Sequence, residues 1–251
     1  MTADFQNRVA LVTGGSRGIG RAAALRLARD GADIAISYAS RKETALDVVR
    51  EIEALGRRAT CACCDVSKPD QVDALVTQTR TELGPIDFLV HSGAISSVSE
   101  HDELTLEEWQ RTMDVNLTGT FLIVRAVKDE MIERGFGRIV AISSVAALRG
   151  RKHQAAYSAS KAGVIAFVRC WSDGLAPHNV RVNAIAPGLI ETEMVHTLTD
   201  EEIAGKVEQT PLGRIGVPDD IANLARFLLS EESSFISGQT LVASGGRVHL
   251  P

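Results

Sequence analysis

A tyrosine and a lysine four residues apart are the side chains of this sequence best suited to acid–base chemistry. Tyr157 and Lys161 lie in a stretch with helical spacing, so they share one face of the expected helix. A free phenol has a pKa of about 10, and a nearby ammonium group favours the phenolate and lowers that pKa. The pair predicts a group that can interconvert a carbonyl and an alcohol, although most such pairs are ordinary surface neighbours.

Two further positions could complete this chemistry. Ser143 and Ser144 end an apolar run shortly before Tyr157, and a hydroxyl there can hold a substrate oxygen beside the phenol. Asn116 interrupts the helical stretch 106–134, where asparagine is a poor interior residue. Either a water-bridging role or a local distortion of the helix would explain Asn116.

A glycine-rich turn follows the first apolar run. Residues 13–20 read Thr-Gly-Gly-Ser-Arg-Gly-Ile-Gly, with the spacing Gly-x-x-x-Gly-x-Gly. Glycines there permit a tight turn and let the backbone approach a pyrophosphate, which a helix N-terminus stabilises. The alternative is a plain glycine turn between a strand and a helix. Its position at the first strand–helix junction favours dinucleotide binding.

The residues after the second apolar run bear on which dinucleotide is bound. An acid there would favour NAD by accepting from the ribose 2′-hydroxyl, but residues 37–42 contain none, and Asp33 lies at the opposite end of the strand. Arg17, with Arg41 or Lys42, could pair with a 2′-phosphate instead, although solvated surface bases are the plainer explanation. We therefore expect NADP(H) rather than NAD(H), with Asp65 accepting from the adenine amino group.

Strand-like and helix-like segments alternate along the chain, which predicts a parallel, doubly wound α/β sheet covered on both faces. The expected strands span 9–13, 32–37, 59–64, 86–91, 138–143, 181–186 and 240–243. The expected helices span 19–30, 42–55, 69–83, 106–134, 155–176 and 218–229. We see no linker or repeat, so residues 1–251 are expected to form one domain. The polar segment 191–211 is expected to be a substrate lid.

Composition excludes several classes of protein. The 251 residues are 45% hydrophobic and 24% charged, which is typical of an ordinary globular chain. A net charge of −5 gives no electrostatic reason to expect nucleic acid or an anionic membrane as partner. No apolar run spans a bilayer and no signal core begins the chain, so we expect a cytoplasmic protein. Cys61 and Cys64 form a C-x-x-C within 58–65, which reads as a buried strand, so reduced cysteines are favoured and no metal site is expected.

Together these motifs make the sequence resemble the short-chain dehydrogenase/reductase family over essentially its whole length. The resemblance implies a Rossmann-type fold with a seven-stranded parallel sheet, Tyr157 as general acid/base, and Ser144, favoured over Ser143 by its spacing, as orienter of the substrate oxygen. It also implies that Lys161 holds the nicotinamide ribose and that Asn116 anchors a water. The expected cofactor-binding residues are Gly14, Ser16, Arg17, Gly18, Ile19, Gly20, Ser40, Arg41, Asp65, Val66, Ser92, Gly93, Tyr157, Lys161, Pro187, Gly188, Ile190 and Thr192.

One motif departs from the family pattern. Where the family usually carries Asn-Asn-Ala-Gly after the fourth strand, this chain has His91-Ser92-Gly93-Ala94. Gly93 keeps a close backbone approach and Ser92 can still form hydrogen bonds, but the two asparagine side chains are missing. A structural role at the strand end is favoured for His91, because neither a nucleophile nor a set of metal ligands accompanies it.

The substrate is less defined. The resemblance is strongest to the 3-oxoacyl-acyl-carrier-protein reductase branch, which implies NADPH-dependent reduction of a ketone, with a 3-oxoacyl thioester as one candidate, and a homotetramer. A sugar or polyol dehydrogenase is an alternative, and a silent NADP(H) sensor or scaffold is another. Three bases near the expected site mouth could attract an anionic or carrier-bound substrate, or could be a solvated loop: Arg149, Arg151 and Lys152.

Overall fold

A single parallel sheet organises the molecule. The computed structural model describes residues 5–96, 98–193 and 199–248, and within them seven parallel strands pair in the order β3-β2-β1-β4-β5-β6-β7. The predicted single-domain, doubly wound α/β fold is confirmed. The strands are β1 (Val9–Thr13), β2 (Asp33–Tyr38), β3 (Ala59–Cys63), β4 (Ile86–His91), β5 (Gly137–Ile142), β6 (Val180–Pro187) and β7 (Thr240–Ala243).

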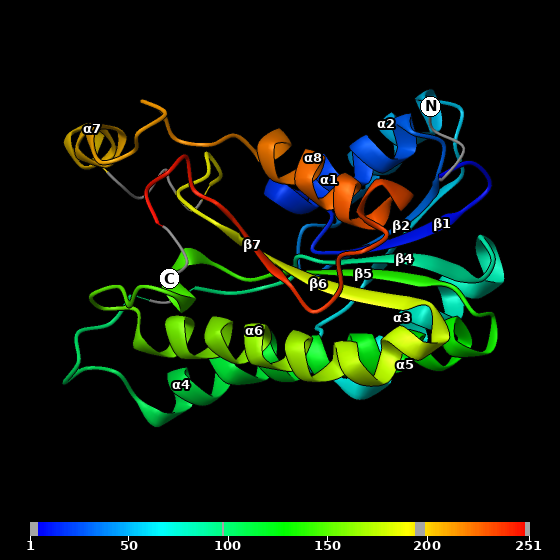
Figure 1. Ribbon diagram of the computed structural model, residues 1–251, viewed down its shortest axis with the longest axis horizontal. Helices are drawn as coiled ribbons and strands as arrows, with labels where there is room; N and C mark the ends of the chain where they lie inside the picture. The colour runs from blue at the N-terminus through cyan, green and yellow to red at the C-terminus, as the bar shows by residue number, and fades with distance from the viewer. Residues whose placement is uncertain (1–4, 97, 194–198, 249–251) are drawn as a thin grey trace.

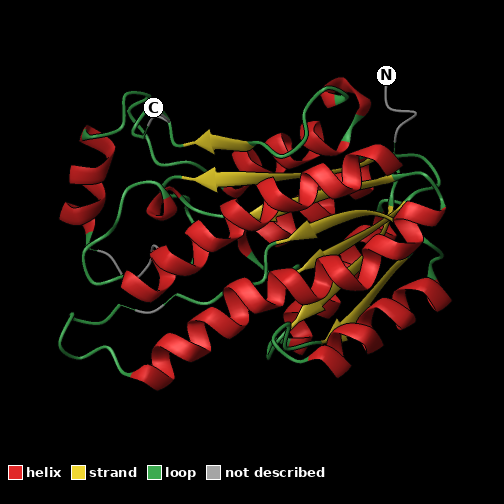
Figure 2. Cartoon of the chain, turned by 60° about the horizontal axis from the view of Figure 1, so that its bottom comes forward, coloured by secondary structure: helices red, strands yellow, loops and turns green. Residues whose placement is uncertain are grey.

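Helices cover both faces of the sheet. Figure 1 shows α1, α2 and α8 on one face and α3, α4, α5 and α6 on the other, and Figure 2 shows the strands enclosed between these layers. The helices are α1 (Gly18–Arg29), α2 (Lys42–Ala54), α3 (Pro69–Glu82), α4 (Leu106–Met113), α5 (Gly119–Glu133), α6 (Ala155–Leu175), α7 (Asp200–Glu208) and α8 (Pro218–Leu229). The helix layers exclude water from both faces, which is why the central strands read as unbroken apolar runs.

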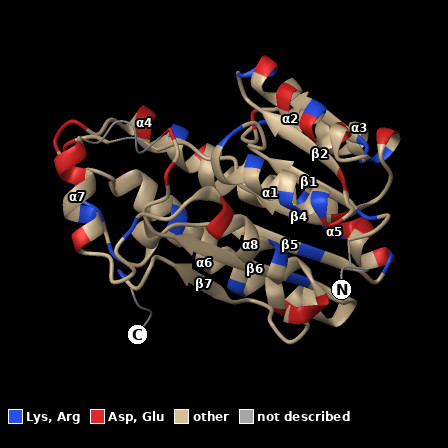
Figure 3. Ribbon diagram, turned by 90° about the horizontal axis from the view of Figure 1, so that it is seen from above, with Lys and Arg blue, Asp and Glu red and all other residues tan. Residues whose placement is uncertain are grey.

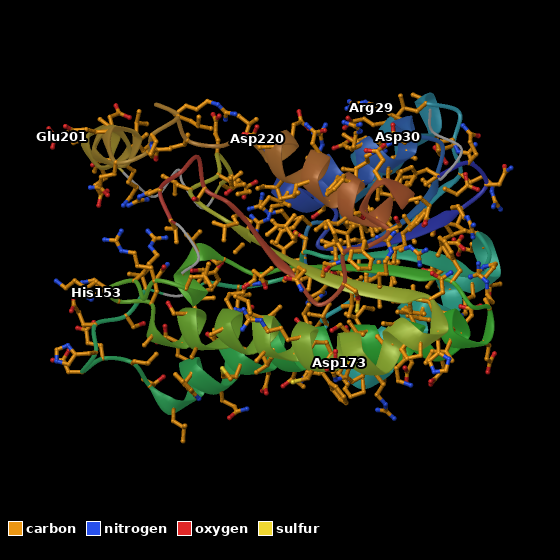
Figure 4. All side chains as sticks on the ribbon, viewed as in Figure 1. Arg29, Asp30, His153, Asp173, Glu201 and Asp220 are labelled. Carbon is orange, nitrogen blue, oxygen red and sulfur yellow. The ribbon has the colours of Figure 1, made fainter. Side chains whose placement is uncertain are left out.

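Two apolar clusters, one on each face of the sheet, form the core. Ile34 and Ile36 of β2 pack under α1 and α8, whereas Leu11 and Leu89 belong to the cluster under α3, α5 and α6. Side chains fill the space between these layers in Figure 4. That figure labels Asp30, whose carboxylate joins the end of α1 to α8 through Arg226 at 3.1 Å. Rigid packing on both faces holds the strand ends in place.

Strand order places the chemistry-bearing segments at one edge. β1 pairs with β2 on one side and with β4 on the other, so the two halves of the sheet diverge at this point. In such folds ligands bind beyond the carboxyl ends of the strands where the order reverses. The glycine-rich turn follows β1, and the other predicted site segments follow β2, β3, β4, β5 and β6 at the same edge.

Three segments differ from the sequence-based expectation. β3 is an edge strand and only partly buried, so the prediction of a buried strand at 58–65 was wrong. Of the segment 191–211 the structure describes residues 191–193 and 199–211, which contain α7, a helix without a buried residue and therefore without an apolar stripe to reveal it. Its start was still encoded, because Thr199 and Glu202 form a capping box. The helix predicted over 106–134 is continuous but includes a π turn, η1 (Asp114–Thr118).

The opposite edge of the sheet is tied by ion pairs. Asp33, at the start of β2, accepts from the guanidinium groups of Arg57 at 2.6 Å and Arg58 at 2.7 Å. Asp87 likewise pairs with Arg8 at 2.9 Å and with Arg134. This confirms that Asp33 lies at the wrong edge to bind a ribose, and its buried carboxylate is already neutralised.

Gly20 is expected to tolerate no side chain. A Cβ there would lie 2.2 Å from the carbonyl oxygen of Gly14, so Gly20→Ala must displace the turn. We expect a loss of roughly 1–3 kcal/mol in the free energy of unfolding, together with weaker dinucleotide binding. Gly174→Ala in α6 is the matched control, because a Cβ at Gly174 meets nothing within 4 Å. That variant should gain up to about 1 kcal/mol from helix propensity. Equal stability of the two variants in urea titrations would contradict the steric account.

Candidate active site

Backbone-to-backbone packing shapes the glycine-rich turn. Gly14 has a φ of +65°, and a Cβ on it would lie 2.9 Å from the Cα of Gly93 in the segment after β4. Gly18, with a φ of +52°, lies under Thr192, where a Cβ would be 3.3 Å from the Thr192 Cγ2 atom. The turn therefore joins the segments after β1, β4 and β6, and its glycines leave a cradle that larger residues would fill. Ser16 is buried beneath it, and Ile19 is half-buried in the first turn of α1.

Thr13 organises the wall after β4. Its hydroxyl oxygen accepts from the backbone N–H groups of Ser92 and Gly93, both at 3.2 Å, and lies 2.7 Å from Nδ1 of His91. Because the Thr13 hydroxyl oxygen accepts from two N–H groups, we assign its proton to the contact with Nδ1. His91 is therefore the neutral tautomer with its proton on Nε2. Burial and, secondly, the charge of Lys161 lower the pKa of His91 to about 3.

This arrangement explains the departure from Asn-Asn-Ala-Gly. His91 is buried and bonded to Thr13, which agrees with the structural role predicted for it. Its Nε2 atom has no hydrogen-bond partner within the described part of the chain. An imidazole thus replaces an amide at this position while Thr13 holds the following backbone.

Tyr157 and Ser144 meet at the predicted catalytic position. Tyr157 is half-buried in the first turn of α6, and Ser144 follows β5. Burial raises the pKa of the Tyr157 phenol, whereas a hydrogen bond with the Ser144 side chain and the charge of Arg151 lower it. The net direction is upward, because burial outweighs the effects of Ser144 and Arg151, and the expected lowering of this pKa by Lys161 is not seen in this structure. Ser143 donates to the backbone carbonyl of Lys161 at 2.8 Å, which leaves Ser144 as the serine at the phenol.

Lys161 is a buried cation. Its ammonium group donates to the carbonyl oxygen of Ile142 at 2.7 Å and lies 5.9 Å from the centre of the Tyr157 ring. Burial lowers the pKa of Lys161 to about 8. The ammonium form is therefore present at neutral pH, close to the phenol whose charge it can stabilise.

Asn116 lies in the π turn, as its interruption of the helical pattern indicated. Its side-chain amide accepts from the N–H of Ile95 and donates to the carbonyl of Ile95, both at 2.9 Å, and it also donates to Ser160 at 3.0 Å. These bonds tie the segment after β4 to α6. Both amide hydrogens are used, so the backbone carbonyl of Asn116, shared with Thr120 at 2.7 Å, is the group left to hold a water.

An acid that sequence reasoning missed lies between the two predicted phosphate-binding arginines. Glu193 accepts from Arg41 at 2.6 Å through one carboxylate oxygen and from Arg17 through the other. Arg17 precedes α1 and Arg41 precedes α2, next to the exposed Ser40. No local signal could have found this contact, because Glu193 is 176 residues from Arg17.

The remaining predicted residues follow β3 and β6. Asp65 accepts from Ser67 and pairs with Arg111 at 2.9 Å. These hydrogen bonds and the Arg111 charge outweigh burial, which raises its pKa, and hold the pKa of Asp65 low. Val66 is buried beside it.

Pro187 ends β6 and leads through Gly188 and Ile190 to Thr192 at the same edge of the sheet. Gly188 packs on Ser244.

Redox and metal sites find no support among the described residues. The four cysteines are free, with Cys61 partly buried, Cys64 buried, and Cys63 and Cys170 exposed. The free thiols of Cys61 and Cys64 agree with the prediction that this pair is reduced. Burial raises the pKa of Cys64 to about 12, which makes its thiolate scarce. Within the described ranges no cluster of His, Cys, Asp and Glu could hold a metal ion, and no helix has the length and apolar character that crossing a bilayer requires.

Comparisons with known proteins agree with this geometry. A family model described as "Enoyl-(Acyl carrier protein) reductase" matches residues 14–247. The chain is 42% identical over 242 residues to a 3-oxoacyl-[acyl-carrier-protein] reductase of Synechocystis, covering 96% of this chain and 97% of that one.

Two solved structures also match. A candidate gluconate dehydrogenase from Agrobacterium tumefaciens has a TM-score of 0.95 at 32% identity and covers all of both chains. A 3-oxoacyl-[acyl-carrier protein] reductase from Brucella melitensis has a TM-score of 0.92 at 36% identity and covers 98% of this chain and 93% of that one.

His91 is expected to remain neutral, with its proton on Nε2, at every pH from 5 to 9. Its pKa of about 3 lies below the value of about 6.5 for an unfolded histidine. The unfolded state therefore binds the extra proton, and stability that is complete above pH 6.5 falls as the pH drops toward 3. Each pH unit costs about 1.4 kcal/mol relative to His91→Asn, which lacks this group. Histidine carbon and nitrogen chemical shifts measure the tautomer directly. An imidazole that titrates near pH 6.5 would rule out the arrangement.

Proposed function

The chain belongs to the short-chain dehydrogenase/reductase family, and from that membership we propose that it reduces a ketone to a secondary alcohol with NADPH, with Tyr157 as the proton donor. It is an NAD(P)-dependent oxidoreductase that acts on C=O or CH–OH groups. The observation that carries the finer proposal is the position of a neutral phenol beside Ser144 and the Lys161 ammonium group.

The residues present fit a dinucleotide. Gly14 and Gly20 keep a cradle open at the N-terminus of α1, where the backbone N–H groups of the first helical turn can meet a pyrophosphate. Arg17 and Arg41 already bind an anion, the carboxylate of Glu193, at the place where a 2′-phosphate is expected. Asp65 is proposed to face the adenine, while Pro187, Gly188, Ile190 and Thr192 are proposed to line the nicotinamide end.

Each site residue has a separate task in the proposed mechanism. A bound nicotinamide cofactor supplies the hydride. Ser144 donates to the substrate carbonyl oxygen, and Tyr157, whose raised pKa keeps it protonated, gives its proton to the same oxygen. Lys161 stabilises the phenolate that remains, while the Asn116 carbonyl can hold a water that returns a proton.

Tyr157→Phe is expected to lower kcat by roughly two to four orders of magnitude while leaving the affinity for NADPH near normal, because the proton donor is lost and the ring remains. Ser144→Ala should lower kcat by roughly a hundredfold, since one donor to the developing oxyanion is lost. Ser143→Ala is the matched control, because Ser143 bonds to the backbone of Lys161 and should affect stability more than turnover. Steady-state kinetics with acetoacetyl thioesters measure all three. Unchanged turnover in Tyr157→Phe would refute the assignment of the acid.

The pH dependence of reduction should follow Lys161. Below its pKa of about 8 the ammonium group stabilises the phenolate formed as Tyr157 gives up its proton. Above that pH the charge disappears, and kcat for reduction should fall.

A cationic rim near Tyr157 favours an anionic or carrier-bound substrate. Arg149, Arg151 and Lys152 are exposed in the segment after β5, and the Arg151 charge reaches Tyr157. Burial lowers the pKa values of Lys206, on α7, and Arg247, and the charge of Arg151 lowers both further. These two bases extend the sequence-predicted cluster. Elsewhere, Figure 3 shows basic and acidic residues interspersed on the outer helices.

The relatives named as 3-oxoacyl reductases favour a 3-oxoacyl thioester. A sugar or polyol dehydrogenase is the second candidate, favoured by the match to a candidate gluconate dehydrogenase. The complete set of Asn116, Ser144, Tyr157 and Lys161 speaks against a silent sensor. We further propose a homotetramer that acts in the cytoplasm and packs through α4, α5, α6 and the C-terminal strand β7; Phe121 of α5 is an exposed apolar side chain. The segment 191–211, of which residues 194–198 lie outside the described ranges, is proposed as a lid.

Neutralising the rim should weaken the use of a carrier-bound substrate. The triple variant Arg149→Gln, Arg151→Gln, Lys152→Gln is expected to raise KM for an acyl-carrier thioester roughly tenfold at low salt, because electrostatic steering is lost. Its KM should then depend less on salt than that of the wild type.

A matched control removes three exposed arginines elsewhere: Arg29, Arg50 and Arg169. The same assays with aldoses, polyols and simple ketones, each with NADPH and NADH, separate the two enzyme candidates. Equal KM values for the rim variant and this control would refute the steering role of the rim. Turnover confined to aldoses or polyols would refute the thioester.

A further inference from the structure

We propose that Glu193 is a specificity-determining residue: in the free protein its carboxylate binds Arg17 and Arg41 in the place of the 2′-phosphate, and it must leave before that phosphate can bind. The inference rests on the proposed preference for NADPH. It adds an internal competitor to the site, which lowers the affinity for one cofactor and not for the other.

The contacts place one acid across two guanidinium groups. Nη1 of Arg41 donates to Oε1 of Glu193 at 2.6 Å, and Nη1 of Arg17 donates to Oε2. The three side chains are 48%, 53% and 45% exposed for Arg41, Arg17 and Glu193, so a phosphate in solution can reach them. Guanidinium groups bind carboxylate and phosphate oxygens with the same fork of donors. The Glu193 carboxylate can therefore occupy the same guanidinium donors as a 2′-phosphate and exclude it.

Glu193 stays charged at working pH. Although burial acts to raise its pKa, hydrogen bonds and charge from Arg17 and Arg41 lower it. Because residues 37–42 contain no acid, Glu193 comes from a distant segment to neutralise these bases. Binding of a 2′-phosphate then exchanges one anion for another, whereas binding of NADH leaves Glu193 where it is. Each exposed ion pair is modest, so the competition is expected to be shallow and reversible.

The exchange also affects how the segment after β6 is held. Glu193 directly follows Thr192, which packs over Gly18 of the phosphate turn, and both belong to the segment 191–211. Releasing the carboxylate removes two of the contacts that hold the start of this segment to the cofactor edge.

Dissociation constants of the full-length protein for NADPH, NADH, 2′-AMP and 5′-AMP, measured by calorimetry without substrate, test the proposal. Glu193→Gln is expected to bind NADPH and 2′-AMP roughly threefold to tenfold more tightly than the wild type, with NADH and 5′-AMP unchanged. Binding of NADPH to this variant should also depend more steeply on salt, because its arginines are no longer neutralised before the phosphate arrives.

Two controls separate this role from a general change of charge. Glu191→Gln removes the same charge two residues earlier, where no described contact joins the carboxylate to Arg17 or Arg41, and should leave all four affinities unchanged. In an Arg17→Ala, Arg41→Ala background Glu193→Gln should give no gain.

The outcomes separate a failure of this inference from a failure of the proposed preference for NADPH. Equal binding of NADPH and NADH by the wild type would refute the proposed cofactor preference. A wild type that prefers NADPH, with a Glu193→Gln variant that binds 2′-AMP no more tightly, would overturn the role of Glu193 alone. An equal gain for 5′-AMP would overturn it too, since the effect would not depend on the 2′-phosphate.

Discussion

Parallel pairing of β1 with β4 is the constraint on which the site depends. A parallel strand can join its neighbour only through a crossover, so every carboxyl end points to the same edge and the connecting helices must cover the faces. At β1 the crossovers diverge to β2 on one side and β4 on the other, which leaves the glycine-rich turn facing the backbone after β4. Thr13 closes this junction with one hydroxyl that serves three neighbours. Residues far apart in the sequence meet because the pairing of the strands brings their carboxyl ends to the same edge of the sheet.

Most of the architecture was predictable from the sequence. A strand that is buried on both faces is an apolar run, and a helix that packs on the sheet has apolar residues with a period of 3.6. The seven described strands carry that signal, and so do the seven helices that cover the sheet, of which α4 and α5 were predicted as one. α7 does not, because it buries no residue and so needs no stripe; only its capping box was readable. The burial of β3 was overestimated because an edge position depends on strand order, which composition does not report.

Some features of the site were likewise predictable from the sequence, and others were not. Tyr157, Lys161 and Ser144 were readable because spacing on a helix and position at a strand end are local properties. The tautomer of His91 was not readable, since it follows from the hydrogen bonds of Thr13, which join the end of β1 to the segment after β4. The direction of the Tyr157 pKa shift was also misjudged: the nearby lysine was visible in the sequence, but the burial of the phenol, which raises its pKa, was not. Contacts such as Arg17 with Glu193 lie beyond any local pattern.

The π turn at η1 has a consequence for the long helix that contains it. One extra residue in a turn advances every later side chain by about 100° around the helix axis. The apolar faces of α4 and α5 therefore point in different directions, although the two helices are continuous. α5 buries Ile123, Val127 and Met131 in the core, whereas Leu106 at the start of α4 is exposed. Asn116 stands at the change of phase, aimed at Ile95 and Ser160. Removing one residue from this turn would redirect one half of the helix relative to the other, so its length is under as strict a constraint as the identity of the residues around it.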